Sequence, residues 1–233
     1  MNAGTYFISG IDTDAGKSVA TGMLARHFMA QNISVITQKL IQTGCNGISE
    51  DIETHRRIMG IPLQPEDCDK TTCPLVFTYP ASPHFAAKID NRTVDTGIIA
   101  EATQKLQARY STVLIEGAGG LMVPLSPDYL TIDYVAEHHL PVILVTSGRL
   151  GSINHTLLSL DACKSRNIPV AAIVFNQYPV ADSLISTDSW NYMKAYTAKL
   201  YPEAKRFVLP LINMQEIDKQ SIIKEEVNAR LQQ

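Results

Sequence analysis

Short apolar runs recur along the chain, and most of them are rich in β-branched residues. Within each run the apolar positions are nearly continuous instead of alternating with polar ones, which is typical of strands covered on both faces. Six runs have this character: Thr5–Ser9, Ile33–Thr37, Thr112–Glu116, Pro141–Thr146, Val170–Phe175 and Phe207–Leu209. The pattern predicts a buried, mainly parallel β-sheet.

Segments with helical spacing of apolar residues lie between these runs. The apolar positions in three of the segments are Val19, Met23, Leu24 and Phe28; Ile99, Ala102 and Leu106; and Ile153, Leu157 and Leu160. Because strands and helices alternate, we expect right-handed crossovers that place helices on both faces of the sheet. The predicted fold class is therefore α/β.

The chain shows no composition shift or low-complexity segment that would separate two domains, so one domain over residues 1–233 is expected. The proline-rich stretch 62–83 interrupts the strand-helix alternation and is interpreted as an inserted loop region. Near the C-terminus, apolar residues at helical spacing predict a final amphipathic helix: Ile217, Ile222, Ile223, Val227 and Leu231.

Composition excludes several classes of function. The net charge of −3 does not favour a nucleic-acid groove, and no apolar run approaches the roughly 18–20 residues of a membrane span. The N-terminus lacks a basic segment followed by a cleavable apolar stretch, so a cytoplasmic protein without membrane or nucleic-acid partners is expected. The four cysteines (Cys45, Cys68, Cys73 and Cys163) fit neither a disulfide framework nor a common zinc pattern, and we expect reduced thiols.

The first predicted strand is followed by the stretch SGIDTDAGKS, which ends like a phosphate-binding loop. The usual pattern is G-x-x-x-x-G-K-[ST], whereas five residues separate Gly10 from Gly16 here. A strand, a glycine turn and a helix start nevertheless form the context in which backbone N–H groups bind phosphate. Lys17 would then reach the terminal phosphates and Ser18 would ligate Mg²⁺. The alternative is a helix start with an exposed lysine.

Polar residues also follow the other predicted strands, at the edge where open parallel sheets bind ligands. Lys39 ends the second strand, Asp51 opens a helical segment, and Glu116 precedes a glycine cluster. Lys39 suits an anionic intermediate, and an acid placed like Glu116 suits a metal ion. The alternatives are a solvated lysine, a helix-dipole acid and a surface acid.

Two further strand ends carry candidate binding groups. After the fourth strand, the amides of Gly151–Asn154 open a predicted helix and could bind a carboxylate. After the fifth strand, the carboxamide of Asn176 offers both a donor and an acceptor for an adenine edge. Taken alone, Asn176 is more typical of a turn residue.

Taken together, these segments resemble the dethiobiotin synthetase family, whose loop is similar to G-T-D-T-x-x-G-K-[ST] and has the longer spacing found here. The resemblance covers residues 4 to about 176 in order, and departs from the family at Ile11, Asp14 and Leu40. After Asn176 the usual P-x-L-G segment is missing. The other similar segments are Lys39 with Thr43-Gly44, Ser82–His84, Glu116–Gly120 and Leu140–His155.

The resemblance implies a single P-loop NTPase-like domain that uses ATP and Mg²⁺ to make dethiobiotin from 7,8-diaminononanoate and CO₂ or bicarbonate. The reaction passes through a carbamate and a carbamic-phosphoric anhydride. The family is homodimeric and its substrate site lies at the dimer interface. The implied residues are Lys17 and Lys39 for catalysis; Asp14, Ala15, Gly16, Lys17, Ser18, Val19 and Asn176 for nucleotide; Thr13, Thr43, Gly151, Ser152, Ile153 and Asn154 for substrate; and Ser18, Asp51 and Glu116 for the metal.

Two other functions share the same architecture. Chromosome-partition and cell-division ATPases switch between partners, but their loop carries an extra lysine near its start, where this chain has Ile11 and Asp12. A nucleotide-binding module without catalysis is the remaining alternative. Only the synthetase has a use for Lys39 beside the terminal phosphate.

Overall fold

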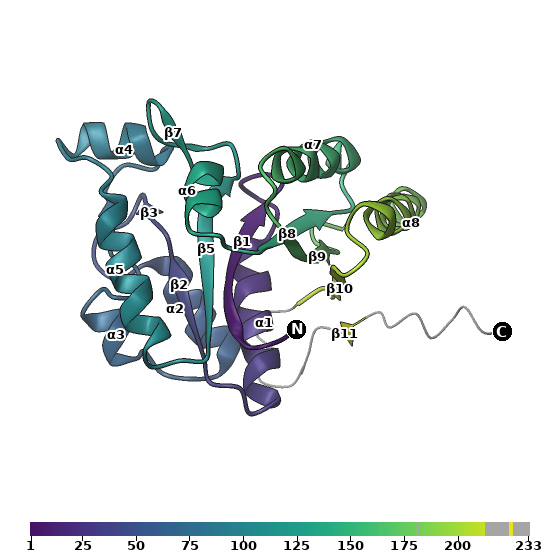
Figure 1. Ribbon diagram of the computed structural model, residues 1–233. Coiled ribbons are helices and arrows are strands. Elements are labelled where there is room, and N and C mark those ends of the chain that lie inside the picture. Colours follow the sequence, from purple (N-terminus) through teal and green to yellow (C-terminus); the bar gives the residue numbers. More distant parts are fainter. Residues whose placement is uncertain (181, 213–223, 226–233) are drawn as a thin grey trace.

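The computed structural model describes residues 1–180, 182–212 and 224–225. A seven-stranded sheet runs through the molecule in the order β11-β10-β9-β8-β1-β5-β2 (Figure 1). Every pairing in it is parallel except the last, in which β11 is antiparallel to β10. The α/β class and the mainly parallel sheet are therefore confirmed.

All six apolar runs form parallel strands of this sheet. Their bounds are Gly4–Gly10 (β1), Val35–Lys39 (β2), Thr112–Gly120 (β5), Val142–Ser147 (β8), Val170–Asn176 (β9) and Lys205–Leu209 (β10). Successive residues of a strand enter opposite layers of the core: Phe7 packs on one face of the sheet and Ile8 on the other, and both are fully buried. Burial on both faces explains why the runs are continuously apolar.

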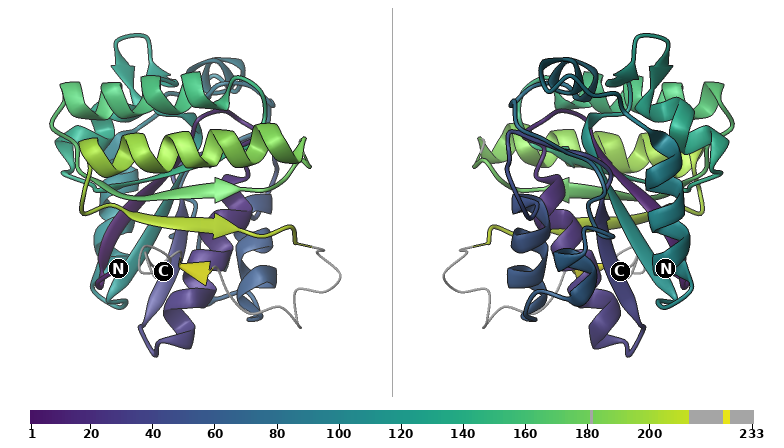
Figure 2. Two further views of the ribbon diagram at one scale, coloured as in Figure 1. Left: turned by 90° about the vertical axis from the view of Figure 1, so that its right-hand side faces the viewer. Right: turned by 90° about the vertical axis from the view of Figure 1, so that its left-hand side faces the viewer.

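Helices cover both faces of the sheet. On one face, α1 (Lys17–Ala30) and α2 (Glu50–Met59) contribute Leu24, Phe28 and Ile58 to the core. The other face is covered by α5 (Thr96–Gln107), α6 (Thr131–Glu137), α7 (Ser152–Ser165) and α8 (Ser183–Leu200). Figure 2 shows α7 and α8 side by side over β9 and β10, with α1 beyond the sheet.

The proline-rich stretch is only partly a loop. It contains the short helices α3 (Pro65–Cys68) and the start of α4 (Pro83–Ile89), and β4 (Val76–Phe77) pairs with β3 (Gln42–Thr43). A second small sheet joins β6 (Pro124–Ser126) and β7 (Tyr129–Leu130). The predicted final helix lies largely outside the described residues, and its one described part, Lys224–Glu225, is strand β11.

The register of the sheet brings the strand ends together. Lys39 at the end of β2 lies opposite Glu116 of β5, and Ser147 at the end of β8 lies opposite Asn176 of β9. Gly10, the last residue of β1, lies between these two pairs in the strand order. The carboxyl edge of the sheet therefore assembles residues that are far apart in sequence.

Candidate nucleotide and metal site

The loop between β1 and α1 needs both of its glycines. Gly16 caps α1 in the left-handed region, at φ 89°, and a Cβ added there would lie 2.2 Å from Nδ2 of Asn176. A Cβ added at Gly10 would lie 2.7 Å from the carbonyl oxygen of Asp12. Any side chain at Gly16 would be strained, and one at either glycine would collide with a neighbour. The wider glycine spacing thus closes into a compact loop at a helix start.

Lys17 folds back over this loop. Its Nζ donates to the carbonyl oxygens of Thr13 (2.9 Å) and Asp12 (3.2 Å), and the residue is buried. Burial, together with the positive charge of Lys39, lowers the pKa of Lys17 from its ordinary value. An anion in front of the loop would favour the charged form of this lysine.

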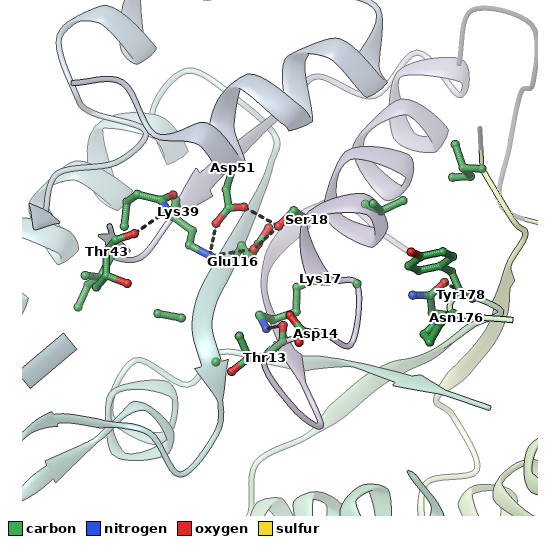
Figure 3. Close-up of a pocket in the computed structure, with 18 of the residues that line it drawn as sticks. Thr13, Asp14, Lys17, Ser18, Lys39, Thr43, Asp51, Glu116, Asn176 and Tyr178 are labelled. Atoms are coloured by element: carbon green, nitrogen blue, oxygen red, sulfur yellow. Dashed lines mark hydrogen bonds and ion pairs between the residues drawn. The ribbon is translucent and has the colours of Figure 1, made fainter. Parts of the chain in front are cut away.

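Ser18 lies between two carboxylates. Its Oγ is 2.7 Å from Oδ1 of Asp51 and 2.9 Å from Oε1 of Glu116 (Figure 3). Asp51 is in the first turn of α2, whose N-cap Ser49 accepts from the amide of Ile52. Glu116 is fully buried in β5. Three elements thus bring one hydroxyl and two carboxylates to one point.

Lys39 neutralises the same two carboxylates. Its Nζ is 2.6 Å from Oδ2 of Asp51 and 2.9 Å from Oε1 of Glu116, and it also donates to the carbonyl oxygen of Gly117 at 3.1 Å. Burial alone would lower the pKa of Lys39, but the two carboxylates raise it above its usual range. Burial alone would likewise raise the pKa of Glu116, which the charge of Lys39 and the hydrogen bond from His55 hold well below its usual range.

These side chains line one cavity of about 1000 Å³. Figure 3 shows Lys17, Ser18, Lys39, Asp51 and Glu116 gathered at its centre. The predicted site residues that line this cavity are Thr13, Asp14, Gly16, Lys17, Ser18, Val19, Lys39, Thr43, Asp51, Glu116 and Asn176. Ala15, a residue of the loop itself, is fully buried and does not line the cavity.

The start of α7 is not part of that cavity. Gly151 is exposed, at φ 92°, and Asn154 is exposed as well, whereas Ser152 is buried with its Oγ 3.0 Å from Oγ of Ser147. Ile153 packs partly against the core. Nearby, Leu150 is 88% exposed and Leu158 is 61% exposed. Within one chain, the predicted substrate residues therefore fall into two groups.

Asn176 is tied to the loop. Its Nδ2 donates to the carbonyl oxygen of Ala15 at 3.0 Å, and its Oδ1 accepts from the amide of Tyr178 at 3.0 Å. A carboxamide has two donor hydrogens and two lone pairs, so one of each is left for a base. Tyr178, Pro179 and Ile212 extend the cavity beyond this residue.

Two residues near the predicted site, Arg149 and His55, were not predicted from the sequence. Arg149 lines the cavity, and its Nη2 is 3.4 Å from Oδ2 of Asp12. His55 is fully buried behind the cavity, with its Nε2 2.7 Å from Oε2 of Glu116. A spacing of four residues puts His55 on the same face of α2 as Asp51, a signal that was available from the sequence.

The donor set fits Mg²⁺. In the part of the chain that the structure describes, no group of three or more His, Cys, Asp or Glu side chains could hold a metal ion. A hydroxyl and two carboxylates are hard oxygen ligands, and Mg²⁺ typically takes few protein ligands, filling the remaining positions with water and substrate phosphates. Ser18, Asp51 and Glu116 match that requirement.

The fold and the loop define the class of protein. A parallel sheet with helices on both faces, and a glycine-lysine-serine turn between β1 and α1, make this a P-loop NTPase fold. A cell division protein FtsY from Thermotoga maritima shares the fold at TM-score 0.55 and 13% identity, covering 96% of this chain and 65% of that chain. A ParA family ATPase from Chlorobium tepidum matches at TM-score 0.52 and 19% identity, covering 93% of this chain and 89% of that chain. Such low identities show the fold alone.

The sequence relatives narrow the class. A protein-family profile described as "AAA domain" matches residues 4–225. The ATP-dependent dethiobiotin synthetase BioD 2 of Pasteurella multocida is 50% identical over 212 residues, covering 91% of this chain and 100% of that protein. The corresponding enzyme of Chlorobaculum tepidum is 54% identical over 189 residues, covering 81% of this chain and 79% of that protein. The chain belongs to the dethiobiotin synthetase family, which confirms the resemblance.

Proposed function

We propose that this protein is the ATP- and Mg²⁺-dependent cyclo-ligase that converts 7,8-diaminononanoate and CO₂ into dethiobiotin in biotin biosynthesis. One amine of the substrate adds to CO₂ and gives a carbamate. The carbamate oxygen attacks the γ-phosphorus of ATP, so ADP leaves and a carbamic-phosphoric anhydride forms. The second amine then attacks the carbonyl carbon, which expels phosphate and closes the cyclic urea.

The observation that carries this proposal is the position of Lys39. A P-loop NTPase needs Lys17 and a metal for its nucleotide, but it has no general need for a second buried lysine on another strand. Here Lys39 lines the same cavity as the loop, and two carboxylates keep it charged. A fixed cation beside the terminal phosphate suits an anionic carbamate that must approach another anion.

The described residues divide the remaining work. Lys17 neutralises the β- and γ-phosphates, for which it must leave the loop carbonyls that it now contacts. Ser18, Asp51 and Glu116 would hold Mg²⁺, which would supply positive charge to the phosphates of ATP. Thr13 and Thr43, which also line the cavity, position phosphate or substrate, and the remaining donor and acceptor of Asn176 bind the base.

The separation of α7 from the cavity supports a homodimer. The amides at residues 151–154 lie at a helix start, where a carboxylate is favoured. A diamine spanning two subunits would bind its carboxylate there and its amines beside Lys39 of the other subunit. The exposed side chains of Leu150 and Leu158 give this region an apolar surface that a partner subunit would cover.

We place the reaction in the cytoplasm. No described helix is long and apolar enough to span a membrane.

The test is a reaction with purified protein, ATP, Mg²⁺, the diamine and isotopically labelled bicarbonate. We expect dethiobiotin that carries the label in its ring carbonyl, and ADP release that depends on the diamine. Lys17→Ala serves as the matched inactive control. ATP hydrolysis at a rate that does not depend on the diamine, with no labelled product, would refute the synthetase function and favour a partner-switching ATPase.

A further inference from the structure

A chain of buried side chains stands behind Glu116, on the side away from the cavity. His55 of α2 contacts Glu116 through Nε2 (2.7 Å) and the hydroxyl of Thr37 through Nδ1 (3.0 Å). Arg56 donates from Nη1 to the same hydroxyl at 2.8 Å. His55 and Thr37 are fully buried, and Arg56 is 2% exposed. None of these three residues lines the cavity described above.

The far end of this chain is anchored by an ion pair. Arg56 makes a two-point contact with Asp67 of α3, from Nε to Oδ2 and from Nη2 to Oδ1, each at 2.8 Å. Asp67 also accepts from the amide of Gln64 at 2.7 Å and from the hydroxyl of Thr72 at 2.7 Å. A two-point contact of this kind fixes the orientation of the guanidinium, so Arg56 points firmly at Thr37.

The donors and acceptors available set the direction of the contacts at the two ends of this chain of side chains. Arginine only donates, so the hydroxyl oxygen of Thr37 accepts from Arg56, and the same hydroxyl holds Nδ1 of His55 at 3.0 Å. A carboxylate only accepts, so Nε2 of His55 donates its hydrogen to Oε2 of Glu116. The other oxygen of Glu116 is the one that Ser18 and Lys39 contact.

We propose that His55 is a positioning residue for the metal site: held in place by Thr37 and Arg56, it binds Oε2 of Glu116 and so presents Oε1 to the ion. The inference rests on the proposed function in one respect, because it takes Glu116 to be a Mg²⁺ ligand. His55 itself touches neither nucleotide nor metal. Its effect is to remove the rotational freedom of the carboxylate before the ion arrives.

Partners that orient a metal ligand typically contribute 10–100-fold to metal affinity. The test is calorimetric titration of ADP into the full chain, once with excess Mg²⁺ and once with EDTA. In His55→Leu we expect affinity for ADP with Mg²⁺ to fall about 10–100-fold and affinity in EDTA to stay at the wild-type value. Because the glutamine side chain can place an N–H donor near the position of Nε2, His55→Gln is expected to retain most of the affinity with Mg²⁺.

Thr146→Val is the matched control, because it removes a buried hydroxyl pair (Thr146 with Thr156, 2.7 Å) that does not touch Glu116. It should bind ADP like wild type in both buffers. Thr37→Val keeps the shape of the side chain, and its affinity for ADP should fall only in the presence of Mg²⁺. This variant therefore tests the proposal if His55→Leu does not fold.

Two results would overturn the inference. The first is an unchanged affinity for ADP with Mg²⁺ in both His55→Leu and Thr37→Val. The second is an equal loss of ADP affinity in EDTA, because that would indicate a disturbed fold instead of a weakened metal site. A wild-type protein that binds ADP equally with and without Mg²⁺ would instead refute the proposed metal site itself.

Discussion

Lys39→Gln separates charge from packing at the centre of the cavity. The lysine is buried and contacts two carboxylates at 2.6 and 2.9 Å, and breaking a buried ion pair costs about 3–5 kcal/mol. Glutamine can still donate to one carboxylate, which returns about 1 kcal/mol. We therefore expect a net loss of about 2–4 kcal/mol in the free energy of unfolding, or roughly 5–15 °C in Tm for a domain of this size. Added Mg²⁺ should restore part of it, because the ion replaces the missing charge between Asp51 and Glu116.

The functional effect should be far more selective. Lys39 does not hold the nucleotide, so ATP affinity measured by calorimetry with Mg²⁺ should stay within about 10-fold of wild type, or about 1.4 kcal/mol. Dethiobiotin formation should fall by roughly 10²–10³-fold or more, because the carbamate loses its fixed cation. Lys88→Gln, at an exposed lysine of α4, is the control for the substitution itself. Full synthetic activity in Lys39→Gln would refute the assignment.

Three further predictions follow from the same geometry. Asp51→Asn should need more Mg²⁺ to reach half-maximal rate, and an unchanged Mg²⁺ dependence would remove Asp51 from the metal site. The folded-state pKa of Glu116 is below its unfolded value, so the stability that Glu116 contributes is complete above about pH 4.5 and is lost as the pH falls towards the folded pKa. The free energy of unfolding should therefore fall less steeply with decreasing pH in Glu116→Gln than in wild type. Identical acid-unfolding profiles would contradict this. Burial raises the pKa of the Cys73 and Cys163 thiols to about 12, and Cys45 is buried as well. A thiol reagent at pH 8 should therefore label the native protein only at the exposed Cys68. Labelling of a second cysteine would contradict this packing.

The strands were predictable because burial on both faces leaves a simple signal. Phe7 and Ile8 enter different layers of the core, and neither position tolerates a polar group, so the run reads as continuously apolar. The ends of the strands were predictable for a second reason, since parallel strands deliver their next residues to one edge. This rule brings Lys39 of β2 and Glu116 of β5 together, whereas Asp51 reaches them from the start of α2.

What the sequence did not reveal depends on partners far apart in the chain. The contact of Asn176 with the carbonyl oxygen of Ala15 joins residues 161 apart, which the pairing of β9 with β8 and of β8 with β1 brings close. His55 was overlooked because its spacing from Asp51 indicates only a shared helix face, whereas its partner Glu116 lies 61 residues further along the chain. The irregular stretch before α4 gave no periodicity, yet its Asp67 anchors the side chains behind Glu116.

The central claim is that ATP phosphorylates a carbamate in this cavity, and the path of one oxygen atom tests it directly. In the proposed reaction, the carbamate oxygen that attacks the γ-phosphorus leaves with the phosphate when the ring closes. Bicarbonate labelled with heavy oxygen should therefore yield labelled inorganic phosphate together with dethiobiotin, provided that it is sampled before bicarbonate exchanges oxygen with water. Phosphate that takes its new oxygen from water instead, at the same rate with and without the diamine, would contradict the account.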